Sequence, residues 1–306
     1  MADKNHAGYP SNSVTLVTNQ IIKMLCFDAT EPSNGNSDRR GYGNNRYIYS
    51  NLRQWLNSPA AAGQWYTAQH SADQTPDSSH VWNGVNQYSG LAGFLNAFTA
   101  NERAALLNTT ITVGKSSTDG GGTETCADKI FPLSCTEVGL SGDHTCGSKL
   151  AIFSDNSSRI ATVTAECVAN SNYNSNPAAN AAWYYWLRDA YAGSADGARR
   201  VYTDGTLDGP DAYYGYGGLR PACNLSSDLL VSDSTDPDGC YTVIYNQAPT
   251  APSTINVPSE VIGGENITVT WGASTDSDGN LAGYVLEKKV DSGTWTQIYK
   301  GSSRTY

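Results

Sequence analysis

A short proline-containing segment separates this chain into two parts of unequal length. Pro249 and Pro252 stand in the polar stretch 247–252, and each proline favours extended backbone in the residue before it. At roughly 150 residues per domain, a chain of this length has room for about two domains. We therefore predict a large domain over residues 1–246, a linker over 247–252 and a smaller module over 253–306.

The smaller module alternates polar and apolar residues, as half-buried β-strands do. Ile267, Val269 and Trp271 would share one face of a strand, with threonines on the other. We expect strands over 266–271, 283–290 and 294–300, with turns at 276–280 and 291–293.

The proline-containing entry, Trp271 and Tyr284 together resemble the first half of a fibronectin type III module. A sandwich of this kind needs roughly 100 residues, and the chain has far fewer after the linker. The resemblance therefore implies an incomplete all-β sandwich over 253–306. It also implies that this chain is a fragment of a longer protein.

Charge and composition exclude several classes of partner. The formal net charge is −10 and no basic cluster is present, so a phosphate backbone would repel the chain. The longest apolar stretch, 21–27, is interrupted by Lys23 and is too short to cross a bilayer, and the first twenty residues lack an export signal. We predict a soluble protein with no nucleic-acid partner and no membrane insertion.

The large domain mixes short helix and strand patterns. Ser50 is expected to cap a helix that buries Trp55, and Thr99 with Glu102 reads as a capping box. Pro221 favours a sheet edge or a bulge in the last strand. The expected helices cover 50–57 and 99–107, and the expected strands cover 13–18, 21–27, 129–134, 183–188, 198–203 and 219–225.

No familiar catalytic or metal-binding pattern stands in the sequence. Residues 113–116 end like a phosphate-binding loop, but the first glycine that such a loop requires would fall at Thr109. The seven cysteines contain no CxxC pair and the chain has only four histidines. Acidic residues near 233–238 could bind calcium, although a solvated turn explains them as well. We predict no metal, no cofactor and no enzyme activity.

Several ordered segments of the large domain carry a family resemblance. They are residues 45–57, 128–134, 137–138, 186–188, 201–205 and 218–222, the last three reading Trp-Leu-Arg, Val-Tyr-Thr-Asp-Gly and Gly-Leu-Arg-Pro-Ala. They resemble an uncharacterised domain family of phages, prophages and gut-associated Gram-positive bacteria, with the likeness spanning roughly residues 14–245. Members of that family often precede fibronectin-like modules in tail and other virion proteins.

The Trp-Leu-Arg and Gly-Leu-Arg-Pro segments also resemble the C-type-lectin-like fold shared with formylglycine-generating enzymes. That resemblance implies an α+β domain with short helices around antiparallel strands. The cysteine pair of those enzymes is missing, because Cys223 stands alone after Arg220. The calcium-dependent sugar motifs of lectins are missing as well. The resemblance therefore implies the scaffold without either chemistry.

Two loops between the expected final strands, 191–197 and 208–217, are the candidate ligand surface. Loop 208–217 carries tyrosines among glycines, which give a large amphipathic contact area at low entropic cost. The same tyrosines could instead cover the core of the domain. The candidate ligand-binding residues are Tyr191, Asp211, Tyr213, Tyr214 and Tyr216.

Large side chains in the expected strands and helices are candidates for the core. They are Trp55, Trp183, Trp186, Arg188 and Arg220. Because a buried arginine needs a carboxylate or several carbonyls, Asp189 and Asp204 are the expected partners.

These features together predict a non-enzymatic phage virion protein. The favoured role is a tail or fibre adhesion module that binds a host-surface glycan or protein and contacts other virion proteins. Three alternatives remain: a head or tail decoration protein without a ligand, a bacterial cell-surface adhesin, and an enzyme on a formylglycine-generating-enzyme-like scaffold. The expected location is the virion, or otherwise the bacterial surface or the extracellular space.

Overall fold

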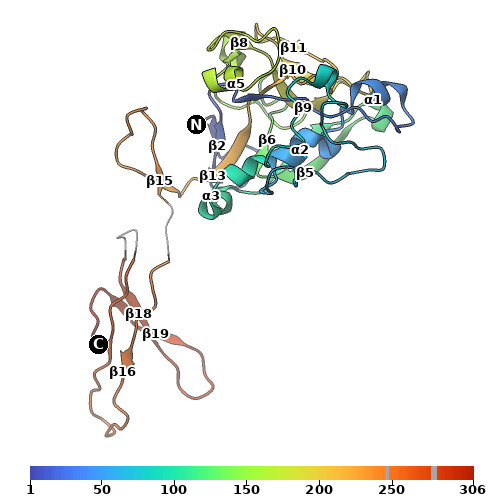
Figure 1. The fold of residues 1–306 in the computed structure, drawn as a ribbon. Coiled ribbons are helices and arrows are strands. Elements are labelled where there is room, and N and C mark those ends of the chain that lie inside the picture. The colour runs from blue at the N-terminus through green and yellow to red at the C-terminus, as the bar shows by residue number, and fades with distance from the viewer. Residues whose placement is uncertain (245–247, 277–280) are drawn as a thin grey trace. The chain divides into compact units, whose positions relative to one another are not determined.

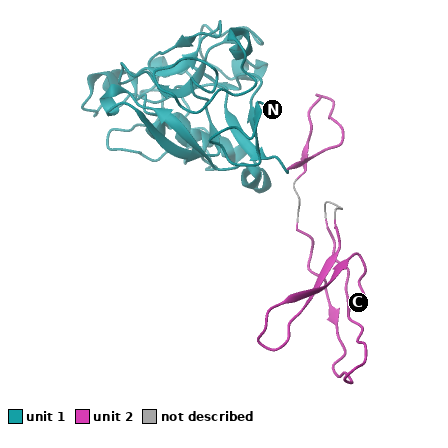
Figure 2. Cartoon of the chain, turned by 180° about the vertical axis from the view of Figure 1, so that it is seen from behind, with its two compact units in different colours: residues 1–228 teal, residues 229–306 magenta. Residues whose placement is uncertain are grey.

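The computed structural model describes residues 1–244, 248–276 and 281–306. Contacts within the chain divide it into unit 1, Met1–Asp228, and unit 2, Leu229–Tyr306, which Figure 2 shows in different colours. The linker over 247–252 stays a prediction, because Gln247 lies outside the described residues. Most of the turn expected at 276–280 also lies outside them.

Both units are built mainly from small β-sheets, and the few, short helices lie in unit 1 (Figure 1). Helices make up 13% of the chain and strands 24%, so the α+β class is confirmed. Within the described ranges, no helix has the length and apolar character needed to cross a bilayer. The strands of unit 1 are β1 (Asp3–Lys4), β2 (Ser13–Val17), β3 (Lys23–Met24), β4 (Thr109–Gly114), β5 (Thr123–Asp128), β6 (Ile130–Phe131), β7 (Ala161–Thr162), β8 (Ala182–Trp183), β9 (Tyr185–Ala190), β10 (Ala198–Val201), β11 (Leu207–Asp208), β12 (Gly218–Leu219) and β13 (Ala222–Ser226).

Two sheets form the centre of unit 1. The first has the order β1-β2-β13-β6, with β13 antiparallel to β2 from Ala222 opposite Val17 to Ser226 opposite Ser13. The second has the order β11-β10-β9-β12-β3, with β9 antiparallel to β10 and parallel to β12. Every residue of β9 is buried, as in a strand that is covered on both faces. Two further pairs, β4-β5 and β7-β8, form separate two-stranded sheets.

The single strand expected over 219–225 is wrong. β12 ends at Leu219 in the five-stranded sheet, and β13 begins at Ala222 in the four-stranded sheet. Pro221 lies between them, where it has no backbone N–H to continue a ladder. Its carbonyl accepts a hydrogen bond from Thr18 N, which directly follows β2 of the four-stranded sheet. At Pro221 the chain therefore passes from the five-stranded sheet to the four-stranded one. In the same way the strand expected over 183–188 divides into β8 and β9.

Both predicted helices are confirmed, each slightly shorter than expected. The Ser50 side chain accepts from Arg53 N at the start of α2, and Thr99 and Glu102 complete the capping box of α3. These caps satisfy backbone N–H groups that the first helical turn leaves unpaired. The helices are α1 (Ser37–Tyr42), α2 (Asn51–Leu56), α3 (Ala100–Ala105), α4 (Asn156–Arg159) and α5 (Ala165–Ala169), with 3₁₀ turns η1 (Tyr47–Tyr49), η2 (Trp82–Gly84), η3 (Phe94–Ala97) and η4 (Ser117–Asp119).

The tryptophans proposed for the core differ in their burial. Trp186 in β9 is fully buried, and its Nε1 donates to Leu25 O at 2.8 Å. Trp55 in α2 is also buried and donates to Ala92 O. Trp183 lies in β8, outside the five-stranded sheet, and is only half-buried. All seven cysteines are free thiols.

Arg188 in β9 forms an ion pair with Glu137, and both side chains are fully buried. The expected pairing with Asp189 or Asp204 is wrong. Asp189 is the next residue along the strand, so its side chain points to the opposite face, where it accepts from two backbone N–H groups. Asp204 lies in an exposed turn, where it accepts from Thr206. The carboxylate partner of Arg188 is Glu137, which lies in a turn 51 positions earlier in the sequence.

The hydrogen-bond partners of Arg220 are carbonyl and hydroxyl oxygens. It is buried, its Nε donates to Thr18 O at 3.0 Å, and one of its terminal nitrogens lies 3.3 Å from the Tyr185 hydroxyl. The guanidinium also lies over the rings of Phe153 and Tyr185. The second kind of partner expected for a buried arginine, carbonyl oxygen, is therefore the one that Arg220 uses.

Unit 2 consists of short antiparallel pairs. The predicted hairpin is confirmed: β18 pairs with β19, and Asp291 in the connecting turn has a φ of 47°. Trp271 is buried and packs edge-on against Tyr284 and Tyr299. The strand expected over 266–271 is reduced to β17. The strands are β14 (Leu230–Val231), β15 (Val243–Ile244), β16 (Ile255–Asn256), β17 (Thr270–Trp271), β18 (Tyr284–Lys288) and β19 (Thr296–Gly301).

Candidate ligand-binding surface

Aromatic side chains from distant parts of unit 1 form one continuous group, which we call the aromatic patch. They come from α1, η2, the segment after α5, β8, the residue between β8 and β9, the end of β10, and the loop between β11 and β12. Neighbouring rings have centroids 4.2 to 6.3 Å apart, the range of favourable aromatic pairs. The members are Tyr42, Trp82, Tyr173, Trp183, Tyr184, Tyr202, Tyr213, Tyr214 and Tyr216.

Tyr216 is the centre of the aromatic patch. Its ring stacks on Tyr214 at 4.9 Å and on Tyr173 at 4.8 Å. Trp82 meets it edge-on at 5.4 Å, and Tyr184 at 5.9 Å. The patch therefore depends on a residue that the sequence had placed among the candidates.

Most rings of the patch are packed by their neighbours and still present surface to solvent, whereas Tyr184 is buried. Tyr213, Tyr214 and Tyr216 are half-buried, whereas Tyr42 and Tyr202 are 44% and 41% exposed. Burial raises the pKa of each of the three loop tyrosines to about 12, so their hydroxyls stay protonated at neutral pH. The patch thus combines partly exposed aromatic rings with hydroxyl groups that can donate and accept.

The loop that carries the three tyrosines is held in place by backbone hydrogen bonds. Tyr213 N donates to Tyr42 O at 3.0 Å, and Trp82 N donates to Tyr213 O at 3.1 Å. Ala212 N donates to Asp196 O, which ties this loop to the preceding one. A ligand would therefore meet a surface that is already ordered and would not have to order the loop on binding.

Two of the candidate residues lie differently from the three loop tyrosines. Tyr191 is 40% exposed and its ring lies 4.1 Å below the Arg199 guanidinium. Among the described residues, no ring contact joins it to the aromatic patch. Asp211 lies beside Tyr214, and burial together with the nearby Asp196 carboxylate raises its pKa. The structure therefore brings Asp211 to the patch and leaves Tyr191 apart from it.

A cation belongs to the patch as well. The Arg200 guanidinium lies 3.9 Å above the Tyr184 ring and pairs with Asp208 across β10 and β11. Arg200, Trp82, Tyr173 and Tyr42 were missed as candidates. No local sequence signal marks them, because each joins the patch only through contacts with distant segments.

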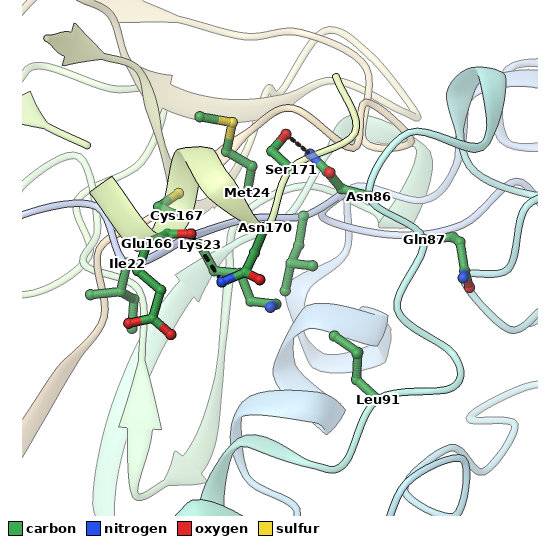
Figure 3. A pocket seen from close by; sticks show the side chains of 11 residues that line it. Ile22, Lys23, Met24, Asn86, Gln87, Leu91, Glu166, Cys167, Asn170 and Ser171 are labelled. Atoms are coloured by element: carbon green, nitrogen blue, oxygen red, sulfur yellow. Dashed lines mark hydrogen bonds between the residues drawn. The ribbon is translucent and has the colours of Figure 1, made fainter. Parts of the chain in front are cut away.

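A small cavity adjoins the aromatic patch. It has a volume of about 130 Å³ and lies between β3, α5 and the segment after η2 (Figure 3). Asn86 links the two features, because its side chain donates to Ser171 Oγ at the cavity and to Gly215 O between two tyrosines of the patch. The lining residues are Ile22, Lys23, Met24, Leu25, Asn86, Gln87, Leu91, Glu166, Cys167, Asn170 and Ser171.

A separate cluster of acidic residues is buried near the start of α2. Asp28, Glu31 and Asp73 are all buried, and His70 Nε2 lies 2.8 Å from Glu31. Burial, followed by the charges of Glu31 and Asp73, raises the pKa of Asp28 well above its usual value. Within the described ranges, no three His, Cys, Asp or Glu side chains are arranged to hold a metal ion. The backbone N–H groups of Asn44 and Asn51 donate hydrogen bonds to the Asp28 carboxylate.

The raised pKa of Asp28 predicts a pH dependence of stability. In the unfolded chain this carboxyl loses its proton at a lower pH than in the folded protein, so the free energy of unfolding falls as pH rises from about 4 through the folded pKa. Asp28→Asn removes this titration, and we expect a flatter profile in urea unfolding measured between pH 4 and 8. If the free energy of unfolding of the variant changes with pH as steeply as that of the wild type, Asp28 does not titrate in this way.

Comparison with known protein families gives a match over residues 12–227 to a family described as a domain of unknown function (DUF6273). Comparison with curated proteins gives no match, and comparison with solved structures gives none either. The matched residues cover most of the chain and nearly all of unit 1, including the aromatic patch. This chain belongs to the DUF6273 family.

Proposed function

We propose that unit 1 is a ligand-binding module of a phage virion protein, in a tail or fibre, and that it binds a host-surface glycan or protein through the aromatic patch. The observation that carries this proposal is the ordered group of half-buried rings around Tyr216. Flat aromatic faces next to hydroxyl groups suit sugar rings, which offer apolar C–H faces and polar edges. A glycan is therefore the ligand that this surface fits best.

The finer fold assignments belong to the same proposal. Unit 1 would be a C-type-lectin-like domain, which is supported by its short helices around mainly antiparallel strands. Unit 2 would include an incomplete fibronectin type III-like module, which is supported by the β18-β19 hairpin and by Trp271 packed against Tyr284. In such an arrangement unit 2 acts as a spacer or as a second, weaker surface binder.

The proposal is tested by binding the purified chain to gut bacterial cells and to a glycan array. We compare the wild type with a variant in which Tyr213, Tyr214 and Tyr216 are all replaced by alanine, after near-ultraviolet circular dichroism has verified its fold. Stacking on an aromatic side chain contributes on the order of 1 kcal/mol, so loss of three rings should weaken binding at least 100-fold.

The matched control is Tyr241→Ala, which removes an exposed tyrosine from unit 2. It should bind as the wild type does. Binding that survives the triple substitution would move the binding site away from the patch. Absence of binding by the wild type to any cell or glycan would contradict the adhesion role.

A further inference from the structure

We propose that the cavity beside the aromatic patch binds the negatively charged group of an acidic saccharide, a sugar that carries a carboxylate, with Lys23 as its counter-charge. This inference rests on the proposed function, because it names the class of glycan that the same surface would take. It is carried by the chemistry of the cavity and by its continuity with the patch.

Lys23 is the one cationic residue that lines the cavity. It lies in β3 and is half-buried, and no ion pair joins its ammonium group to a carboxylate in the part of the chain that is described. Glu166 lines the same cavity but is exposed, and Figure 3 shows the Glu166 carboxylate apart from the lysine. An ammonium group that lines a cavity without a counter-ion favours an anionic ligand there, because a charge-assisted hydrogen bond is stronger than a neutral one.

Ser171 supplies a second donor. Its hydroxyl oxygen accepts from Asn86 Nδ2 at 3.0 Å and from Tyr173 N at 3.2 Å. Since a hydroxyl has two lone pairs and one proton, both lone pairs are engaged and the proton remains to be donated. A carboxylate only accepts hydrogen bonds, so its charge matches the Lys23 ammonium group, and the Ser171 hydroxyl, which Figure 3 shows apart from Lys23, can donate to another oxygen of the same saccharide.

The cavity and the patch are connected through two parts of the chain. Ser171 lines the cavity, and Tyr173, two residues later, stacks on Tyr216 in the patch. Asn86 joins the two features from the other side through Gly215 O. A sugar ring stacked on the tyrosines could therefore extend its charged substituent to Lys23 without leaving the surface.

The size and charge of the cavity limit the substituent. Its volume of about 130 Å³ leaves room for a carboxylate and its attached carbon atoms. One lysine balances one negative charge, and no other cationic side chain lines the cavity to balance a second. A singly charged carboxylate therefore fits better than a phosphate monoester with two charges.

The test uses pairs of glycans that differ only in the acidic group. Oligosaccharides containing glucuronate and oligosaccharides ending in N-acetylneuraminate are immobilised beside the same molecules with each carboxyl reduced to an alcohol. The full chain is applied as wild type, Lys23→Met, Lys23→Arg and Lys149→Met. Lys149 is exposed and lies outside the cavity, so Lys149→Met makes the same change in net charge elsewhere.

We expect the wild type and Lys149→Met to bind at least one acidic series about ten-fold more tightly than its reduced form. Lys23→Met should lose this preference and still bind the reduced form as the wild type does, and Lys23→Arg should keep part of it. Equal binding of the two forms by the wild type would overturn the inference and leave the adhesion role standing. A preference that persists in Lys23→Met would overturn it as well, and binding of neither form would contradict both proposals.

Discussion

Replacing Arg188 by methionine is expected to lower the free energy of unfolding of unit 1 by about 3–5 kcal/mol, because it leaves the Glu137 carboxylate buried without its counter-ion. The two guanidinium nitrogens donate to the two Glu137 oxygens at 2.6 and 2.5 Å. The same carboxylate also accepts from the Tyr9 hydroxyl and from Ser134 N. The pair thus joins β9, the turn after β6 and the N-terminal segment. Its loss should therefore destabilise unit 1 as a whole.

The control for this prediction is Arg40→Met. Arg40 is an exposed residue of α1 and donates to the carbonyls of Asn34 and Gly35 just before that helix, so we expect a change within about 1 kcal/mol. Both variants are compared with the wild type by urea unfolding at pH 7. A loss below 1 kcal/mol in Arg188→Met would mean that the pair is not buried as the structure has it.

Gly215→Ala is expected to destabilise the loop of the aromatic patch by about 3 kcal/mol. A Cβ at this position would lie 1.8 Å from Val85 O, a backbone atom whose own residue donates to Trp82 O. Relief of such a contact requires the backbone to move, which is the costly form of overpacking. Because Gly215 stands between Tyr214 and Tyr216, we also expect weaker glycan binding in the variant that remains folded.

Gly41→Ala is the matched control, since a Cβ there meets nothing within 4 Å. Gly41 lies in α1, where alanine is favoured over glycine, so its unfolding free energy should rise by up to about 1 kcal/mol. The stabilities of both variants and of the wild type are measured by thermal and urea unfolding. Equal stability of Gly215→Ala and the wild type would show that the loop is free to shift away from Val85.

Local signals allowed part of this fold to be predicted from the sequence. The caps at Ser50 and Thr99 place α2 and α3 correctly, because a cap and the N–H groups it satisfies lie within four residues of each other. The strand over 13–18 and the hairpin after the linker follow from short-range alternation and turn residues. Pro221 was recognised as a special position, but its effect, a change of sheet, depends on which strands lie beside it.

Long-range partners could not be predicted in this way. Glu137 is separated from Arg188 by fifty-one positions, and the sequence offers several nearer carboxylates. The tyrosines of loop 208–217 could be recognised as a candidate surface from composition alone. The contributions of Tyr42, Trp82 and Tyr173 become visible only when the chain is folded, because three separate segments bring them to Tyr213 and Tyr216.

The most direct test of the aromatic patch as a binding surface is to observe its rings while a glycan binds. The protein, with isotope-labelled tyrosine rings assigned by single Tyr→Phe substitutions, is titrated with the strongest ligand from the glycan array and followed by NMR. We predict saturable shifts at Tyr173, Tyr213, Tyr214 and Tyr216, and none at the exposed Tyr241 of unit 2. A glycan that binds and shifts none of the rings of the patch would contradict the account.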